Sequence, residues 1–114
     1  MYYSLRTPQT ERTYREHLER GIEYCIYCEK DLLKKEYNHW VLLENRYPYD
    51  AIFSKHDMLA PKRHIPDASE LSRTEWEDYY VIEEDLRRDY DVKWENFPHR
   101  RTIQSHYHIH LLSF

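Results

Sequence analysis

The most constraining segment of the chain is residues 106–112, where three histidines alternate with apolar residues in the order His-Tyr-His-Ile-His-Leu-Leu. Successive side chains of a β-strand point to opposite faces, so an extended segment with this sequence has a histidine face and an apolar face. The strand rise would separate neighbouring histidines by roughly 6.6 Å and the outer two by roughly 13 Å. One metal ion could therefore reach two of the histidines and not all three, and we expect them to have different roles.

Length and composition favour one compact domain. A chain of 114 residues can bury one hydrophobic core and is too short for two, so we expect a single domain over residues 1–114. Hydrophobic residues amount to 40% and aromatic residues to 16%, which suffices for a globular protein. The formal net charge of −4 disfavours non-specific binding to nucleic acid, but a local basic cluster could still hold a small phosphate ligand.

The sequence also predicts where the protein resides. It has no run of 18 apolar residues that could span a bilayer, so we expect no membrane partner. The N-terminal residues Met-Tyr-Tyr-Ser-Leu-Arg lack the apolar stretch of a secretory signal, which predicts a cytoplasmic protein in which disulfides are disfavoured. The chain contains one glycine, which excludes a glycine-rich phosphate loop, so phosphate must be held by side chains and ordinary backbone.

Two segments have the signals of helices. Residues 10–20 are rich in Glu, Arg and Leu, place Tyr14 and Leu18 four positions apart, and precede a glycine that can act as the C-cap. Residues 72–75, Ser-Arg-Thr-Glu, form a capping box, and apolar and aromatic residues then follow at helical spacing as far as Leu86. We expect a short N-terminal helix and a longer second helix whose aromatic stripe belongs to the core.

The remaining patterned segments favour strands. Runs rich in β-branched, aliphatic and aromatic residues occupy residues 40–45, 51–54 together with 57–60, 92–95 and 102–112. A turn-forming Tyr-Pro-Tyr-Asp separates the first two runs. This order of elements lacks the alternation of parallel βαβ units. It predicts an α+β fold with a mostly antiparallel sheet of about five strands, packed by one long helix and a short N-terminal helix.

Cys25 and Cys28 form a Cys-x-x-Cys pair, which is the usual half of a tetrahedral zinc site. Two thiolates three positions apart on a tight turn can converge on one ion. The same spacing occurs in thioredoxin-like redox motifs, although the βαβ setting that such motifs require is not predicted here. Inert structural thiols are the third interpretation. The spacing favours zinc and leaves the other two interpretations open.

The histidine pattern near the C-terminus closely resembles the signature of the histidine triad (HIT) superfamily of nucleotide hydrolases and transferases. Three further segments, residues 25–28, 43–48 and 56–64, occur in the order and rough spacing of zinc-containing members. Together with the triad they span Cys25 to Leu112, which is most of the chain. The resemblance implies a HIT-like fold and a structural zinc ion held by Cys25, Cys28, His64 and His106.

The resemblance also implies a reaction at phosphorus. HIT enzymes use the middle histidine as a nucleophile that forms a nucleotidyl-histidine, and this role corresponds to His108. A neutral imidazole is a competent nucleophile near pH 7 without a helping base. His110 would orient His108 or contact the transferring phosphate, Asn45 would hold the ribose hydroxyls, and His56 would have a supporting role.

Phosphate-binding groups are expected directly before the triad. Cationic and polar side chains there could stabilise charge on the phosphoryl oxygens, and they are Arg100, Arg101, Thr102, Gln104 and Ser105. The familiar hydrolases have a Gly-Gln-Ser/Thr run at this place, whereas residues 101–105 are Arg-Thr-Ile-Gln-Ser. Ile103 occupies the third position of the run, so a hydroxyl would have to come from Thr102 or Ser105 in a shifted register.

The leading hypothesis is a zinc-stabilised HIT-type enzyme that cleaves a phosphoanhydride or phosphoramidate bond of a purine nucleotide. A close variant transfers the nucleotidyl group to phosphate or another acceptor. The alternatives from other classes are a non-catalytic, zinc-stabilised nucleotide-binding module and a small zinc-held domain that binds a protein partner through its aromatic surface. Because HIT relatives are often dimers with joined sheets, the resemblance implies a homodimer as an alternative to a monomer.

Overall fold

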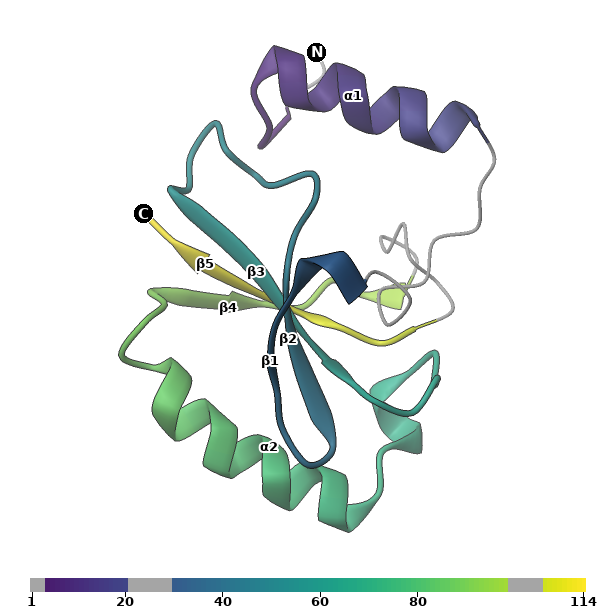
Figure 1. Ribbon diagram of the computed structural model, residues 1–114, viewed down its shortest axis with the longest axis vertical. Coiled ribbons are helices and arrows are strands. Elements are labelled where there is room, and N and C mark those ends of the chain that lie inside the picture. The colour runs from purple at the N-terminus through teal and green to yellow at the C-terminus, as the bar shows by residue number, and fades with distance from the viewer. Residues whose placement is uncertain (1–3, 21–29, 99–105) are drawn as a thin grey trace.

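The structure is a computed structural model that describes residues 4–20, 30–98 and 106–114. Its helices and strands are, in chain order, α1 (Pro8–Glu19), β1 (Leu33–Glu36), β2 (Trp40–Glu44), β3 (Lys55–Pro61), α2 (Arg73–Leu86), β4 (Val92–Trp94) and β5 (Ile109–Ser113). The strands form one antiparallel sheet in the order β1-β2-β3-β5-β4. The α2 helix lies along the sheet, whereas α1 lies beyond the strand ends (Figure 1). The predicted α+β fold is confirmed.

Both helices begin at the caps that the sequence supplies. The side chain of Thr7 accepts a hydrogen bond from the backbone N–H of Thr10, so α1 starts at Pro8, two residues before the predicted start. Proline suits this first position because its missing N–H would have no partner within the helix. At α2, Ser72 and Glu75 form the predicted capping box, in which each side chain accepts the other's backbone N–H.

Strand β1 was not predicted, and the strand boundaries differ from the prediction at two further places. Residues 51–54 are not a strand, because the backbone N–H groups of Ile52 and Phe53 donate to the carbonyl of Tyr49 and form a turn. Strand β5 begins at Ile109, whereas the prediction began at residue 102. Residues 102–105 lie outside the described residues, and residues 106–108 belong to no strand. The N–H of Tyr107 donates instead to the carbonyl of Ile65, at 2.7 Å.

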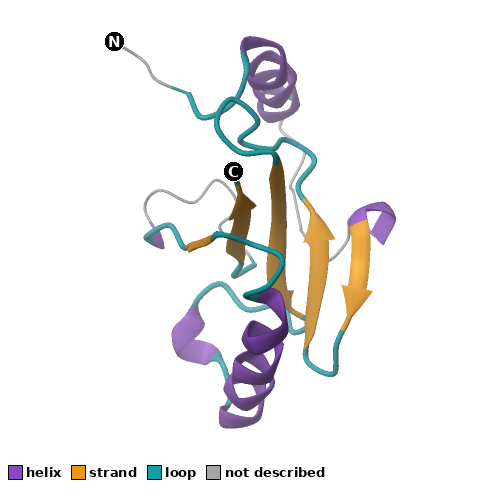
Figure 2. Cartoon of the chain, turned by 90° about the vertical axis from the view of Figure 1, so that its left-hand side faces the viewer, coloured by secondary structure: helices purple, strands orange, loops and turns teal. Residues whose placement is uncertain are grey.

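The sheet separates two apolar clusters. One lies between the sheet and α2, and it contains Trp40, Leu42, Leu59, Ile65, Leu71, Tyr79, Ile82, Leu86, Tyr107, Ile109 and Leu111. The second, smaller cluster lies on the opposite face and consists of Val41, Leu43, Met58 and Ala60. Figure 2 shows α2 against one face of the sheet only. Tyr107, Ile109 and Leu111 therefore face α2, as the alternation predicted, and the three histidines belong to the other face.

Two short 3-10 helices, η2 (Lys30–Leu32) and η3 (Ala68–Glu70), complete the described secondary structure. The indole N–H of Trp40 donates to the carbonyl of Glu75 at 2.8 Å, which ties β2 to the first turn of α2. Among the helices that the structure describes, none is both long and apolar enough to cross a membrane.

Candidate functional site

The three histidines of the triad are buried beside a fourth, His56, which comes from β3. Their exposed fractions are 0% for His106, 5% for His108, 5% for His110 and 3% for His56. The imidazole of His110 is in contact with two of the others. Its Nδ1 atom lies 2.7 Å from Nε2 of His56, and its ring centre lies 4.9 Å from that of His108. The histidine face predicted from the sequence is therefore a packed cluster and not a solvated strand face.

Backbone groups determine where the protons of His56 and His110 lie. The N–H of Tyr49 donates to Nδ1 of His56 at 3.0 Å, so a neutral His56 must have its proton on Nε2. This Nε2–H donates to Nδ1 of His110, which leaves the proton of a neutral His110 on its own Nε2. One backbone N–H therefore assigns the tautomers of two rings.

The tautomer of His108 is assigned in the same way. Its Nδ1 atom lies 3.1 Å from the carbonyl oxygen of His106, and because a carbonyl only accepts, Nδ1 must have the proton. A neutral His108 then has its lone pair on Nε2. An unprotonated ring nitrogen is what a histidine nucleophile needs.

His106 points in a different direction from the other two triad members. Its Nε2–H donates to the carbonyl of Pro61 at 2.6 Å, so its Nδ1 lone pair faces Nδ1 of His64, 3.3 Å away. Two nitrogens that share one tetrahedral zinc ion at the usual Zn–N distance are about 3.3–3.4 Å apart. The two predicted histidine ligands are therefore brought together at a suitable spacing.

The other half of the predicted zinc site, Cys25 and Cys28, lies outside the described residues. Within the described ranges 4–20, 30–98 and 106–114, no group of three or more His, Cys, Asp or Glu residues could hold a metal ion. The histidine pair accordingly needs ligands from elsewhere to form a complete site. His106 could bind a metal ion through Nδ1 while its Nε2–H donates to the carbonyl of Pro61. A hydrogen bond from the other ring nitrogen to a carbonyl is the usual way in which a metal-binding histidine is oriented.

The environment of His56, His106 and His110 favours their neutral forms. Burial, the charge of Arg6 and the neighbouring His108 lower the pKa of His56 to about 3. Burial, His108, His56 and Arg6 together hold the pKa of His110 well below its usual range. Burial also lowers the pKa of His106. Neutral His56 and His110 rings can each donate a hydrogen bond and are poor general acids.

Asn45 lies at the edge of this cluster, directly after β2. Its side-chain oxygen accepts the N–H of Tyr47 at 2.8 Å, and its Nδ2 lies 3.1 Å from Nε2 of His56. Because the N–H of Tyr49 places the proton of His56 on that nitrogen, Asn45 and His56 both present N–H donors at this contact. The five residues predicted to bind phosphate lie outside the described part of the chain. They are Arg100, Arg101, Thr102, Gln104 and Ser105.

Two residues at the site were not predicted. The ring of Tyr49 packs on His56 and His110, with ring centres 4.3 Å and 5.5 Å away. The guanidinium carbon of Arg6 lies 4.9 Å from the centre of the Tyr49 ring. Tyr49 belongs to the turn that follows Asn45, so its position in the sequence could have predicted that it lies near the site. Nothing in the sequence around Arg6 indicated that it would reach the site.

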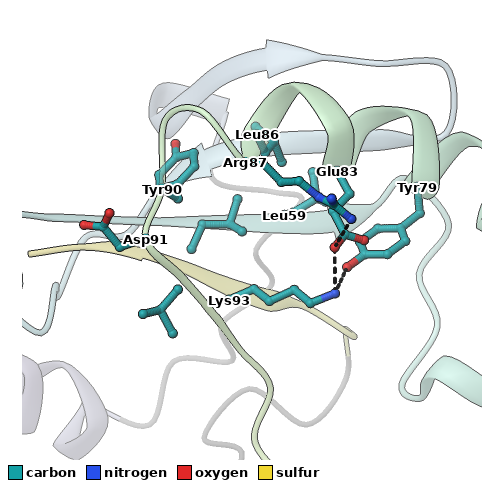
Figure 3. A pocket seen from close by; sticks show the side chains of 10 residues that line it. Leu59, Tyr79, Glu83, Leu86, Arg87, Tyr90, Asp91 and Lys93 are labelled. Carbon is teal, nitrogen blue, oxygen red and sulfur yellow. Dashed lines mark hydrogen bonds and ion pairs between the residues drawn. The ribbon is translucent and has the colours of Figure 1, made fainter.

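A well-formed cavity lies elsewhere. It has a volume of about 240 Å³ and lies on the α2 side of the sheet, over Leu59 and Leu111 (Figure 3). Hydrogen bonds or ion pairs engage all six polar side chains that line it, namely Tyr79, Glu83, Arg87, Tyr90, Asp91 and Lys93. Each of these polar groups therefore already has a partner within the protein.

Comparison with solved structures identifies the fold. A HIT family hydrolase from Clostridium thermocellum is 18% identical with a TM-score of 0.60, covering 82% of this chain and 92% of that one. A HIT family hydrolase from Legionella pneumophila is 17% identical with a TM-score of 0.58, covering 79% and 92%. A histidine triad nucleotide-binding protein from Candida albicans is 18% identical with a TM-score of 0.54, covering 77% and 73%.

The chain therefore has the histidine triad fold, and the resemblance inferred from the sequence is confirmed at the level of the fold. No family profile and no curated protein matches the chain by sequence.

Proposed function

We propose that the protein is a HIT-type nucleotide hydrolase or nucleotidyl transferase that uses His108 as its nucleophile. The observation that supports this most directly is the hydrogen bond from Nδ1 of His108 to the carbonyl of His106, which leaves the lone pair on Nε2. Structural neighbours described as HIT family hydrolases and as a histidine triad nucleotide-binding protein point to the same class. The proposed substrate is a purine nucleotide with a phosphoanhydride or phosphoramidate bond.

The proposed reaction has two displacements at one phosphorus atom. Nε2 of His108 attacks the phosphorus attached to the nucleoside, a P–N bond forms, and the bond from phosphorus to the leaving group breaks as that group departs with a proton taken from solvent. Water then attacks the same phosphorus, the P–N bond breaks, and the nucleoside monophosphate is released. The Nε2–H of His110 donates to a phosphoryl oxygen, where charge accumulates in both transition states.

Residues around His108 bind the nucleotide in this proposal. The amide of Asn45, which His56 does not hold, donates to a ribose hydroxyl. Thr102, Gln104 and Ser105 contact the phosphate in this proposal, as the resemblance implies.

Intact-mass spectrometry of the protein mixed with adenosine phosphoramidate tests the proposal. A transient gain of one AMP, followed by free AMP, would support nucleotidyl transfer. A run with added inorganic phosphate distinguishes transfer from hydrolysis, because a phosphorolytic enzyme would release ADP. Nucleotide binding without an adduct or turnover, in folded protein, would favour the non-catalytic binding module instead.

We also propose a structural zinc ion held by Cys25, Cys28, His64 and His106. The support is the 3.3 Å spacing of the two histidine Nδ1 atoms together with the Cys-x-x-Cys motif. A closed site of four protein ligands has no open position for substrate, so the ion would stabilise the fold and take no part in the reaction.

The zinc proposal predicts one zinc ion per chain by elemental analysis. Replacing His64 with alanine is expected to remove most of it and to lower the unfolding temperature by about 10 °C or more, because zinc binding supplies folding energy. The matched control is His39→Ala, in the turn between β1 and β2. If His64→Ala kept its zinc, or if the purified protein lacked zinc while fully folded, the ligand assignment would be wrong.

The protein is further proposed to be a cytoplasmic homodimer that joins two sheets. Strand β4 is an edge of the sheet, and its Trp94 is 37% exposed. On the adjoining helix, Tyr80 is 62% and Val81 68% exposed. Light scattering after size-exclusion chromatography is expected to give twice the chain mass, and Trp94→Lys to give the chain mass. A monomer at high micromolar concentration would contradict this assignment.

A further inference from the structure

The N-terminal segment is bonded to the turn that follows Asn45. Nε of Arg6 donates to the carbonyl of Tyr47 at 2.7 Å, and the N–H of Ala51 donates to the carbonyl of Leu5 at 3.0 Å. The carboxylate of Asp50 accepts from the N–H of Thr7 and from the hydroxyl of Thr10. Figure 1 shows α1 beside the loop between β2 and β3. This turn is thus held from outside the sheet.

Arg6 is the centre of this attachment. Its guanidinium carbon lies 3.9 Å from the ring centre of Tyr14 and 4.9 Å from that of Tyr49. The same guanidinium pairs with Glu11 at 3.6 Å, and the Arg6 side chain is only 15% exposed. A planar guanidinium can stack on rings while its N–H groups bond in the plane, which an ammonium cannot do. The position therefore requires arginine in particular.

Tyr49 transmits this constraint to the reactive cluster. Its ring packs on His56 and is stacked on His110 at 29°. Its backbone N–H is the donor that assigns the tautomer of His56, and the Nε2–H of His56 in turn assigns that of His110. The position of one backbone N–H, held by a residue more than forty positions earlier in the chain, therefore determines both rings.

We propose that Arg6 is a positioning residue that fixes the tautomers of His56 and His110 through Tyr49. The effect on turnover rests on the proposed function, whereas the effect on the tautomers does not. Arg6 touches neither His56 nor His110 in a hydrogen bond of the described structure, so it acts through the turn. Its charge also favours the neutral forms of both rings, in agreement with the direction of their pKa shifts.

Long-range ¹H–¹⁵N correlation spectra of the histidine rings test the proposal in the protein without substrate. The wild type is expected to show His56 and His110 each as a single Nε2–H tautomer. Arg6→Met should give mixed tautomers at both rings. Arg6→Lys should restore the single Nε2–H tautomers only in part, because lysine keeps the charge and lacks the planar group that stacks on the rings. Arg12→Met, an exposed arginine of α1, is the matched control and should resemble the wild type.

Kinetics with adenosine phosphoramidate provide the second readout. Arg6→Met is expected to lower kcat about 10- to 100-fold with little change in KM, since it disturbs the alignment of reacting groups rather than nucleotide binding. Unchanged single tautomers in Arg6→Met, or an equal change in Arg12→Met, would overturn the proposal. If Arg6→Met does not fold, the same spectra are recorded on Arg6→Lys, and unchanged single tautomers in that variant would overturn the proposal. If the wild type shows no turnover, the proposed function fails while the spectra still test the positioning role.

Discussion

Replacing His108 with alanine is expected to lower turnover of adenosine phosphoramidate by about 10⁴-fold or more, because the variant lacks the atom that forms the bond to phosphorus. Substrate binding should change much less, since the proposed nucleotide contacts come from other residues. The measurement is single-turnover release of AMP together with intact mass, where the variant should show no adduct at any time.

Two controls separate lost chemistry from a damaged fold. His108→Ala leaves the carbonyl of His106 without its imidazole donor, which can cost about 1–3 kcal/mol if water does not replace it. Unfolding curves of the variant should therefore accompany the kinetics. His39→Ala, outside the cluster, should keep full activity. Turnover by His108→Ala within tenfold of the wild type would show that another group is the nucleophile.

The side-chain pattern predicted the faces of the triad segment better than it predicted the strand. The alternation with period two predicted one strand through residues 106–112, whereas residues 106–108 belong to no strand. The sheet partner of β5 is β3, and their register begins at the pair Ile109 and Leu59. Before that pair, Tyr107 bonds to Ile65 instead. Where β5 begins to pair with β3 therefore depends on the loop that contains Ile65, and the side-chain pattern of residues 106–112 contains no information about that loop.

Strand β1 was missed for a related reason. Its sequence, Leu-Lys-Lys-Glu, has no alternation, and all four residues are exposed. Pairing with β2 makes it a strand, and it shares a register with Val41 and Leu42. Tertiary context overrides weak β propensity at such an edge.

Site residues that belong to short sequence motifs could be predicted. Contacts between residues that only the sheet brings together could not. The triad and Asn45 could be identified from motifs. The contact between His56 and His110 joins residues 54 positions apart and requires the antiparallel register of β3 and β5. The contribution of Arg6 requires in addition the packing of α1 on the turn after β2. Chemistry is thus recognisable from residue type, whereas the groups that orient it depend on topology.

Acidification from pH 7 to pH 5 is expected to destabilise the fold, with His56 alone contributing about 2 kcal/mol. Its pKa is about 3 in the folded protein and about 6.5 in the unfolded chain, so the unfolded chain binds more protons below pH 6.5. The stability that the neutral ring supplies is complete above pH 6.5 and is lost as the pH falls toward 3. His110, whose pKa is also lowered, adds a loss of the same sign.

Urea unfolding at several pH values measures this loss, and the window from pH 7 to pH 5 isolates the histidines. Arg63 lowers the pKa of Glu75 to about 2, so the stability from that carboxylate is lost only as the pH falls below about 4.5. A chelator present throughout keeps metal release from adding to the effect. His56→Asn removes one titrating group, and its stability should fall about 2 kcal/mol less than that of the wild type over the same window. Equal pH dependence in the two proteins would mean that His56 is not held neutral, and the tautomer assignment that begins at Tyr49 would fail with it.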